Sequence, residues 1–253
     1  MKLTLIQTDI AWNSQHANIA RAASLIAGTV ETDIIILPEV FNSGFLPANT
    51  EECTSHAHET VSWLRTNAKK RGFAICTSIF ETEGDKTHNR LYFVKPDGSV
   101  VTYDKRHLFI GDEGNYISRG NKRTTCEYKG WRILFLVCYD LRFPVWSRNR
   151  DDYDLIIIVA NWPEPRRDVW KTLLRARAIE NQCYVAGVNR VGTDPNGVSF
   201  AGESMVIDPY GRDILALDPF RETTGTAEIS LDQLTRFRES FPAWRDRDEF
   251  TIL

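Results

Sequence analysis

The chain has 253 residues, 42% of them hydrophobic and 26% charged, with 31 basic and 34 acidic side chains and a net charge of -3. This composition is typical of a globular protein and gives no reason to expect a nucleic acid or a membrane as partner, because positive charge is not in excess and no apolar run is long enough to span a bilayer. The five cysteines are odd in number and form no C-x-x-C pair, which favours a reducing cytoplasm.

The first half of the chain predicts alternating strands and helices that end in a hairpin. Apolar and helical stretches alternate as far as residue 80, and Pro96-Asp97-Gly98 then supplies a turn between two short strands. The predicted elements are the strand Leu3–Asp9, the helix Ala17–Ala27, the strand Asp33–Leu37, the helix Glu59–Arg71, the strand Phe73–Phe80 and the hairpin strands Leu91–Lys95 and Val100–Tyr103.

The second half repeats this order of elements with almost no sequence identity to the first. The middle strand of each half is an isoleucine-rich run without alternation, which is typical of a strand buried on both faces. The predicted elements are the strand Trp131–Val137, a short helix from Pro144, the strand Asp154–Val159, the helix Asp168–Gln182, the strand Cys183–Asn189 and the hairpin strands Glu203–Ile207 and Asp213–Leu217.

Two similar halves without a Gly/Ser-rich linker predict a single domain over residues 1–253. The expected fold class is α/β, as a four-layer α/β/β/α sandwich with two pseudo-repeated halves: two sheets pack face to face and helices cover the outside. The tail from about residue 231 to 253 is polar and aromatic. We expect it to wrap the body or to reach a partner subunit in a homodimer.

Cys138 lies at a predicted strand-to-helix elbow. It follows the apolar strand Trp131–Val137, and Pro144 is suited to the first turn of the helix that comes next. A thiol at such an elbow stands clear of its own sheet and faces the N–H groups and positive dipole end of the next helix, which favour the thiolate. The position therefore suits a nucleophile.

Polar residues also follow the two middle strands. Glu39 comes directly after the first, and Asn161-Trp162 comes after the second. Because polar residues collect at the carboxyl ends of the central strands in such a fold, we expect these positions to converge with Cys138. Taken alone, Glu39 is more simply a strand-end carboxylate in solvent, but beside a cysteine it becomes a candidate general base.

Two further charged residues follow the first hairpin. Taken alone, Lys105 predicts a solvated basic loop, and the functional alternative is an ammonium group aimed at a developing oxyanion. Glu113, in Gly111-Asp112-Glu113-Gly114, predicts a surface loop acid when it is considered by itself. Neither residue carries a functional prediction without its neighbours.

The other cysteines and the paired histidines favour structural or incidental roles. Cys76 and Cys183 lie in apolar strands and are expected in the core, whereas Cys53 and Cys126 lie in polar stretches and look incidental. His56-Ala57-His58 has the spacing of a metal half-site, but no cluster completes it, so a solvated loop and no metal is the prediction. The chain also lacks a G-x-S-x-G, a P-loop and a G-x-G-x-x-G motif.

Three separated motifs carry a family resemblance. The motifs Leu37-Pro38-Glu39, Tyr103-Asp104-Lys105 and Cys138 to Pro144 together resemble those of the carbon–nitrogen hydrolase (nitrilase) superfamily, over essentially the whole chain. The strings at 137–148 and 159–163 are similar to those of bacterial YafV-like omega-amidases. The αββα sandwich of that superfamily agrees with the internal repeat.

The resemblance implies a hydrolase that cleaves a small-molecule primary amide through a thioester. It implies Cys138 as the nucleophile, Glu39 as the base and Lys105 as the cation that holds the oxyanion, assisted by the backbone N–H of Tyr139. Glu113 best matches the second acid of the family. This chemistry needs no metal and no organic cofactor.

Similarity to omega-amidases implies short dicarboxylic monoamides as substrates, of the 2-oxoglutaramate and succinamate type. Their free carboxylate calls for a further cation, for which Arg166 is the candidate beside Asn161 and Trp162; the alternative for Arg166 is a solvated arginine at a helix start. Three rival functions stay open: a nitrilase, carbamoylase or aliphatic amidase of the same fold, a papain-like hydrolase with His107 as base, and a catalytically silent binding module.

Overall fold

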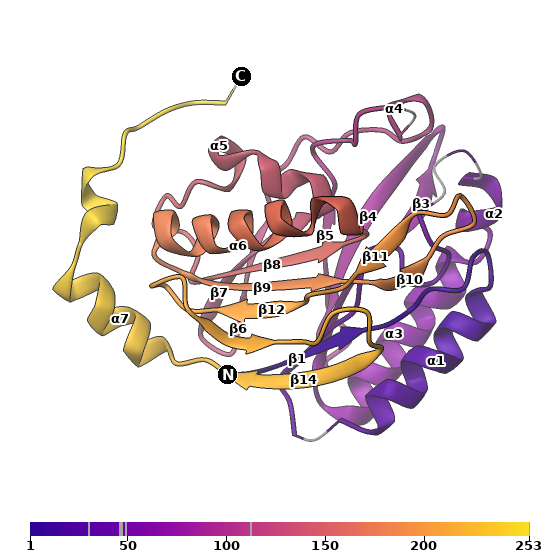
Figure 1. Ribbon diagram of the computed structural model, residues 1–253, viewed down its shortest axis with the longest axis horizontal. Coiled ribbons are helices and arrows are strands. Elements are labelled where there is room, and N and C mark those ends of the chain that lie inside the picture. The colour runs from indigo at the N-terminus through magenta and orange to yellow at the C-terminus, as the bar shows by residue number, and fades with distance from the viewer. Residues whose placement is uncertain (30, 46–47, 49, 112, 253) are drawn as a thin grey trace.

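The computed structural model describes residues 1–29, 31–45, 48, 50–111 and 113–252. Two six-stranded sheets pack face to face, and helices cover their outer faces (Figure 1). The predicted α/β/β/α sandwich is therefore confirmed. Its halves alternate strands and helices in the order that the sequence predicted.

The helices and strands have the following bounds in the described residues. The α-helices are α1 (Gln15–Ala27), α2 (Thr50–Thr54), α3 (Ala57–Arg71), α4 (Glu113–Tyr116), α5 (Pro144–Ser147), α6 (Arg167–Asn181) and α7 (Leu231–Ser240), and short 3-10 helices include η2 (Cys138–Arg142), η3 (Glu164–Arg166) and η4 (Ala243–Asp246). The strands are β1 (Lys2–Gln7), β2 (Ile34–Ile36), β3 (Ala74–Glu83), β4 (Lys86–Val94), β5 (Val100–Asp104), β6 (Thr125–Tyr128), β7 (Trp131–Val137), β8 (Leu155–Ala160), β9 (Tyr184–Asn189), β10 (Val191–Thr193), β11 (Ser199–Ala201), β12 (Met205–Ile207), β13 (Asp213–Ala216) and β14 (Thr223–Glu228).

The first sheet has the strand order β14-β1-β2-β3-β4-β5. Strands β1, β2 and β3 are parallel, and the flanking strands pair antiparallel. Side chains alternate between its two faces: Leu3, Leu5 and Ile36 pack in the core shared with the second sheet, whereas Ile6 and Ile35 pack with helices α1 and α3. Both faces of β2 are therefore buried, which explains its apolar sequence without alternation.

The second sheet has the order β13-β12-β9-β8-β7-β6, which matches the first sheet strand for strand. Each sheet has an antiparallel edge strand (β14 or β6), three parallel strands (β1-β2-β3 or β7-β8-β9) and a closing hairpin (β4-β5 or β12-β13). Helix α6 covers the outer face through Trp170, Leu174 and Ala178. The predicted pseudo-repeat is confirmed by this equivalence.

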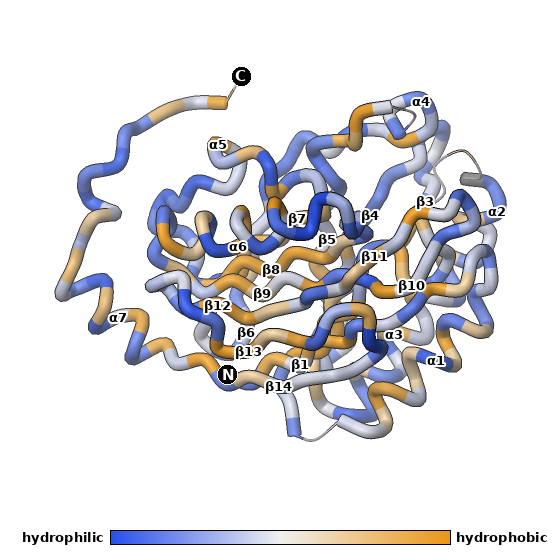
Figure 2. Tube along the Cα trace, in the orientation of Figure 1, coloured by the Kyte–Doolittle hydropathy of each residue, from blue (hydrophilic) through white to orange (hydrophobic). Residues whose placement is uncertain are grey.

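The C-terminal tail begins with the amphipathic helix α7. The Ser230 side chain caps it by accepting the N–H of Gln233 at 3.3 Å, and Leu234 is buried against the sheets. Beyond α7 the chain runs along the outside of the body and touches it at Gln182, whose side chain bonds the main chain of Phe241 and Trp244 (Figure 1). Figure 2 shows that apolar residues gather along the central strands of the body.

Several short elements were not predicted, because they depend on distant parts of the chain. Strand β14 pairs with β1 across more than two hundred residues, with Leu3 opposite Ala227. Strands β6, β10 and β11 and helices α2 and α4 are three to five residues long and have too few residues to show a periodicity. The strand predicted to end at Phe80 continues to Glu83, where it turns directly into β4.

Two sequence predictions need correction. His56 and His58 are exposed, as predicted, but they lie at the start of α3 rather than in a loop, and Nδ1 of His56 is 3.4 Å from Oε2 of Glu59. Cys53 was expected to be incidental, yet it is buried beside Val40. The predictions that Cys76 and Cys183 are core residues are confirmed.

Candidate active site

The chain turns sharply at Cys138, between β7 and η2. The φ angle of Cys138 is +44°, a left-handed conformation that is strained for a residue with a side chain. β7 ends one residue earlier, and the 3-10 turn that begins at Cys138 leaves its side chain lining a cavity. The predicted elbow is confirmed, although the 3-10 turn precedes the short helix from Pro144.

Asp140 ties this turn to the end of β5. Its buried carboxylate accepts the N–H of Val137 at 3.1 Å, the hydroxyl of Tyr103 at 2.7 Å, and the main-chain N–H and Nδ1 of His107 at 2.8 Å each. The His107 ring also stacks on Phe143, with 3.8 Å between ring centroids. His107 is therefore engaged in holding the turn.

Glu39 is fully buried just after β2, and donors hold both of its carboxylate oxygens. Oε1 accepts from Nδ2 of Asn89 at 2.7 Å and from Nζ of Lys105 at 3.1 Å, and Oε2 accepts the main-chain N–H of Asn161 at 2.8 Å. The main-chain carbonyl of Asn161 in turn accepts the Sγ–H of Cys138 at 3.8 Å. The three strand ends meet, as the sequence predicted.

Lys105 lies between two buried carboxylates. Its Nζ is 3.1 Å from Oε1 of Glu39 and 3.0 Å from each oxygen of Glu113. Glu113 begins α4, and its carboxylate also accepts the N–H of Phe109. Taken alone, Lys105 and Glu113 were each expected in a solvated loop. Both expectations are wrong: the two side chains are buried together, and their opposite charges neutralise each other. The same holds for the solvent-exposed alternative at Glu39.

Burial and charge together set the protonation of this cluster. Burial disfavours the charged form of Lys105, but Glu113 and Glu39 outweigh it and raise the pKa of the ammonium group. Burial raises the pKa of Glu113 against the pull of Lys105. Burial and then the charge of Glu39 raise the pKa of Cys138 well above its ordinary value. Burial and Glu39 thus oppose the stabilisation of the thiolate that the elbow position predicted.

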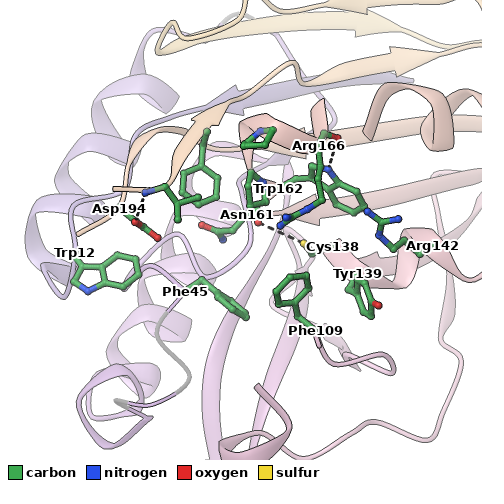
Figure 3. A pocket seen from close by; sticks show the side chains of 14 residues that line it. Trp12, Phe45, Phe109, Cys138, Tyr139, Arg142, Asn161, Trp162, Arg166 and Asp194 are labelled. Atoms are coloured by element: carbon green, nitrogen blue, oxygen red, sulfur yellow. Dashed lines mark hydrogen bonds between the residues drawn. The ribbon is translucent and has the colours of Figure 1, made fainter. Parts of the chain in front are cut away.

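Cys138 opens onto a cavity of about 370 Å³. Its wall includes the aromatic residues Trp12, Phe45, Phe109 and Trp162. In Figure 3 Phe109 and Trp162 lie near the sulfur, and Trp12 lies at the other end of the cavity beside Asp194. A mostly apolar cavity with a few converging polar groups is typical of a small-molecule site. The structure thus brings the predicted pocket residues Asn161, Trp162 and Arg166 to one cavity with Cys138.

Two arginines, Arg142 and Arg166, line this cavity with their guanidinium groups beside aromatic rings. Arg142 lies 5.0 Å from the ring centroid of Trp162, and Arg166 lies 5.4 Å from that of Phe109. Neither guanidinium forms a salt bridge with any acid in the described part of the chain. The acid in the cavity lining, Asp194, is on the far side from Arg142 (Figure 3). The side of the cavity nearer the arginines is therefore positive.

The chain matches a known protein family and the solved structure of a relative. A family model described as carbon-nitrogen hydrolase matches residues 2–239 of the chain. The chain belongs to the carbon-nitrogen hydrolase family. A relative of this hydrolase in the solved structures is XC1258 from Xanthomonas campestris, a CN-hydrolase superfamily protein: it is 42% identical with a TM-score of 0.96, and the match covers 100% of this chain and 99% of that one.

The curated relatives of this carbon-nitrogen hydrolase include amidases. The chain is 47% identical to omega-amidase YafV of Escherichia coli (strain K12), over 100% of this chain and 98% of that protein. It is 38% identical to a 2-oxoglutaramate amidase of Bacillus subtilis (strain 168), over 97% of this chain and 98% of that protein. The chain is therefore an amidase.

Sequence reasoning missed three residues at the site of this hydrolase. Arg142 lies inside the motif that begins at Cys138, four residues after the cysteine, and Asp140 lies two residues after it; their positions in that motif were the available signal. Asn89 gave only a weak signal, as a polar residue early in a strand that becomes apolar. Tyr139, predicted for its backbone N–H, lines the cavity next to Cys138.

The part of the chain that the structure describes contains neither a candidate metal cluster nor a membrane-spanning helix. No three His, Cys, Asp or Glu side chains there are grouped so that they could hold a metal ion. None of the helices in that part of the chain is long and apolar enough to cross a membrane.

Proposed function

We propose that this amidase is an omega-amidase, which cleaves the terminal amide of a short dicarboxylic monoamide of the 2-oxoglutaramate or succinamate type to an acid and ammonia. One observation carries the proposal: a single cavity holds the Cys138 thiol, backed by the Glu39–Lys105 pair, together with two arginines that form no salt bridge among the described residues. The names of the omega-amidase and 2-oxoglutaramate amidase relatives support the same substrate class.

The first half-reaction forms a thioester on Cys138. Glu39 takes the thiol proton, which the raised pKa of Cys138 makes necessary, and the sulfur attacks the amide carbon. The resulting oxyanion accepts hydrogen bonds from Nζ of Lys105 and from the backbone N–H of Tyr139. The C–N bond then breaks, the nitrogen takes a proton from the Glu39 carboxyl group, and ammonia leaves.

The second half-reaction hydrolyses the thioester. Glu39 takes a proton from a water molecule, the hydroxide attacks the thioester carbon, and the collapse of the intermediate expels the Cys138 sulfur, which recovers its proton. A carboxylate that carries two protons in turn, one in each half-reaction, must stay in one place, and the donors Asn89 and Asn161 hold both oxygens of Glu39. Glu113 holds the Lys105 ammonium in line, since both of its oxygens lie 3.0 Å from Nζ.

The arginines supply the specificity for a second carboxylate. A guanidinium group binds a carboxylate through two parallel N–H donors, and an aromatic neighbour fixes its plane. Arg166 is held further, because Nε1 of Trp162 donates to its main-chain carbonyl at 2.9 Å. The sequence predicted Arg166 for this role, and Arg142 on the same cavity is a second cation for the same carboxylate.

Other activities of the same family share the cysteine, the acid and the lysine, so the catalytic residues do not separate them. A neutral aliphatic amide, an N-carbamoyl compound or a nitrile differs from a dicarboxylic monoamide in what lies beyond the reacting carbon. The two arginines favour the anionic substrate over the neutral ones. The silent binding module is disfavoured because the amidase relatives cover the whole chain.

The test compares kcat/KM for succinamate and 2-oxoglutaramate with that for propionamide. We expect the dicarboxylic monoamides to be preferred, and Arg166→Ala to raise KM for succinamate roughly 10- to 100-fold while the turnover of propionamide changes little. Arg175→Ala is the matched control, because Arg175 pairs with Asp213 and does not line the cavity. Preference for propionamide, or turnover of a nitrile instead, contradicts the proposal.

We also propose that the enzyme is a cytoplasmic homodimer. Four cysteines, Cys76, Cys126, Cys138 and Cys183, are present as thiols, which supports a reducing compartment. Phe241 in the tail is 61% exposed and Ile179 on α6 is also exposed, which leaves apolar surface for a second copy to cover. Light scattering of the purified chain tests the dimer, and a monomer at micromolar concentration contradicts it.

A further inference from the structure

Asn161 lies between the base and the nucleophile, and nearly all of its polar atoms are used there. Its main-chain N–H donates to Oε2 of Glu39 at 2.8 Å, and its main-chain carbonyl accepts the Cys138 thiol at 3.8 Å. Its side-chain Nδ2 donates to the main-chain carbonyl of Glu39 at 2.6 Å. Because that carbonyl can only accept, this last bond fixes which end of the amide is the NH₂ group.

The remaining polar atom, Oδ1 of Asn161, is left without a donor. It is buried and has no hydrogen-bond partner among the described residues, and the residue as a whole is only 7% exposed. A buried acceptor without a donor carries a desolvation penalty, so such atoms are rare in folded proteins. Of the buried polar side chains with such an atom, Asn161 is the one that lines the Cys138 cavity (Figure 3).

A primary amide brings two N–H donors into this cavity, whereas most polar atoms near the sulfur are donors or are already engaged. Glu39 and Glu113 both accept from Lys105, and the Asn161 carbonyl accepts from the thiol. A substrate N–H requires an acceptor, and Oδ1 of Asn161 is buried, fixed in orientation and part of a residue that is hydrogen-bonded to Glu39.

We infer that Oδ1 of Asn161 accepts an N–H of the substrate amide and so makes the enzyme selective for amides over esters. The inference rests on the proposed function, since it assigns a substrate group to the same site. With one N–H held by Asn161, the nitrogen turns its lone pair towards Glu39, where it takes the proton that releases ammonia. The bond strengthens as the nitrogen gains positive charge, so it favours the transition state over the bound substrate.

The experiment measures kcat/KM for succinamate and for its ester analogue, monomethyl succinate, in the wild type and in Asn161→Ala. The two substrates share the acyl chain and the carboxylate and differ in the N–H groups. Asn161→Ala also removes a bond to Glu39, which slows both substrates. The ratio of amide to ester isolates the contact with Oδ1, and we expect it to fall about tenfold, the usual effect of one neutral hydrogen bond.

Asn89→Ala is the matched control. Asn89 also donates to Glu39, at 2.7 Å, but it does not line the cavity. This variant should slow the amide and the ester together and leave their ratio within about twofold of the wild type. An unchanged ratio in Asn161→Ala means that Asn161 only positions Glu39, and this overturns the inference.

Two further measurements cover a variant that does not fold and a failure of the proposed substrate class. If Asn161→Ala does not fold, calorimetry on Cys138→Ala compares the dissociation constants of succinamate and monomethyl succinate; the amide should bind about tenfold more tightly, and equal affinities overturn the inference. If the wild type prefers propionamide over succinamate, the proposed substrate class fails, and the same ratio is measured with propionamide and methyl propionate. Failure of the substrate class and failure of the Asn161 contact are thereby distinguished.

Discussion

In the first half of the molecule β1 ends before Asp9 and β2 ends before Glu39, whereas in the second half the equivalent strands β7 and β8 end before Cys138 and Asn161. Asp9 pairs with the buried Arg190 at 2.8 Å and joins the halves. Cys138 instead adopts a strained turn over the cavity. The ends of equivalent strands thus hold an ion pair in one half and the thiol that we propose as the nucleophile in the other.

Glu39 and Asn161, which follow the equivalent strands β2 and β8, meet across the sandwich. Glu39 accepts the main-chain N–H of Asn161 at 2.8 Å, and its carbonyl accepts the Asn161 side chain at 2.6 Å. Facing strand ends come together because the two sheets pack face to face with the same strand order. A repeated fold therefore brings two different polar residues to one point, and the asymmetry of the site comes from the residue types and not from the backbone.

The largest difference between the halves should appear in the pair Cys138→Ala and Asp9→Ala. Cys138→Ala should lower the rate of amide hydrolysis by on the order of 10⁵- to 10⁶-fold, because no other group replaces the nucleophile, and should leave the thermal unfolding temperature unchanged. Asp9→Ala should retain the catalytic residues but lower Tm by roughly 2–4 °C, since the partly exposed Asp9 neutralises Arg190. Near wild-type turnover in Cys138→Ala would refute the whole reading of the site.

Glu39→Gln tests whether the strand end of the first half carries the proton transfers. The variant keeps the size of the side chain but cannot move a proton, so kcat/KM for succinamate should fall roughly 10²- to 10⁴-fold. Circular dichroism on the same preparation checks that the fold is retained. A loss of less than tenfold would show that Glu39 is not the base.

The sequence was sufficient to predict the layers of the fold and the four residues that the structure brings together: Glu39, Lys105, Cys138 and, through the family resemblance, Glu113. Apolar runs without alternation marked β2 and β8, and the repeated order of elements gave the second sheet its place. Glu39, Lys105 and Cys138 lie in separated motifs that were recognisable together. Taken alone, Glu39 and Lys105 each favoured a solvated position without a catalytic role. The presence of all three motifs in one chain was therefore the basis of the prediction.

The rest depended on contacts that no local pattern contains. Glu113 is buried because Lys105 neutralises it. Taken by itself it predicted a surface loop acid, and only the family resemblance implied it as the second acid. The pKa of Cys138 depends on distant residues in the same way: the helix end favours the thiolate, but burial and then the charge of Glu39 raise the pKa of the thiol. β14 pairs with β1 from the far end of the chain, which only the assembled sheet reveals.

Lys105→Ala should have the next largest effect, because it removes the charge that bridges the two carboxylates and that we propose to hold the oxyanion. Activity should fall roughly 10²- to 10³-fold, and Lys105→Arg should not restore it, since a planar fork does not replace a point charge. The charge of Lys105 lowers the pKa of Cys138, so its removal should move the pH profile of iodoacetamide alkylation to higher pH. An unchanged profile, or a fully active arginine variant, would place Lys105 away from the reacting atoms.

The smallest effect is expected at His107, which lies two residues beyond Lys105 and belongs to the contact between the halves. Its Nδ1 donates to Asp140 and its ring stacks on Phe143, so it supports the turn at Cys138 without approaching the sulfur as a base. His107→Gln should therefore reduce kcat/KM for succinamate less than tenfold, as expected for a supporting hydrogen bond of the usual strength. The pH dependence of kcat should keep its shape, because no proton transfer passes through the imidazole. Loss of all turnover in His107→Gln, with Tm unchanged, would favour a cysteine–histidine mechanism and remove Glu39 from the role of base.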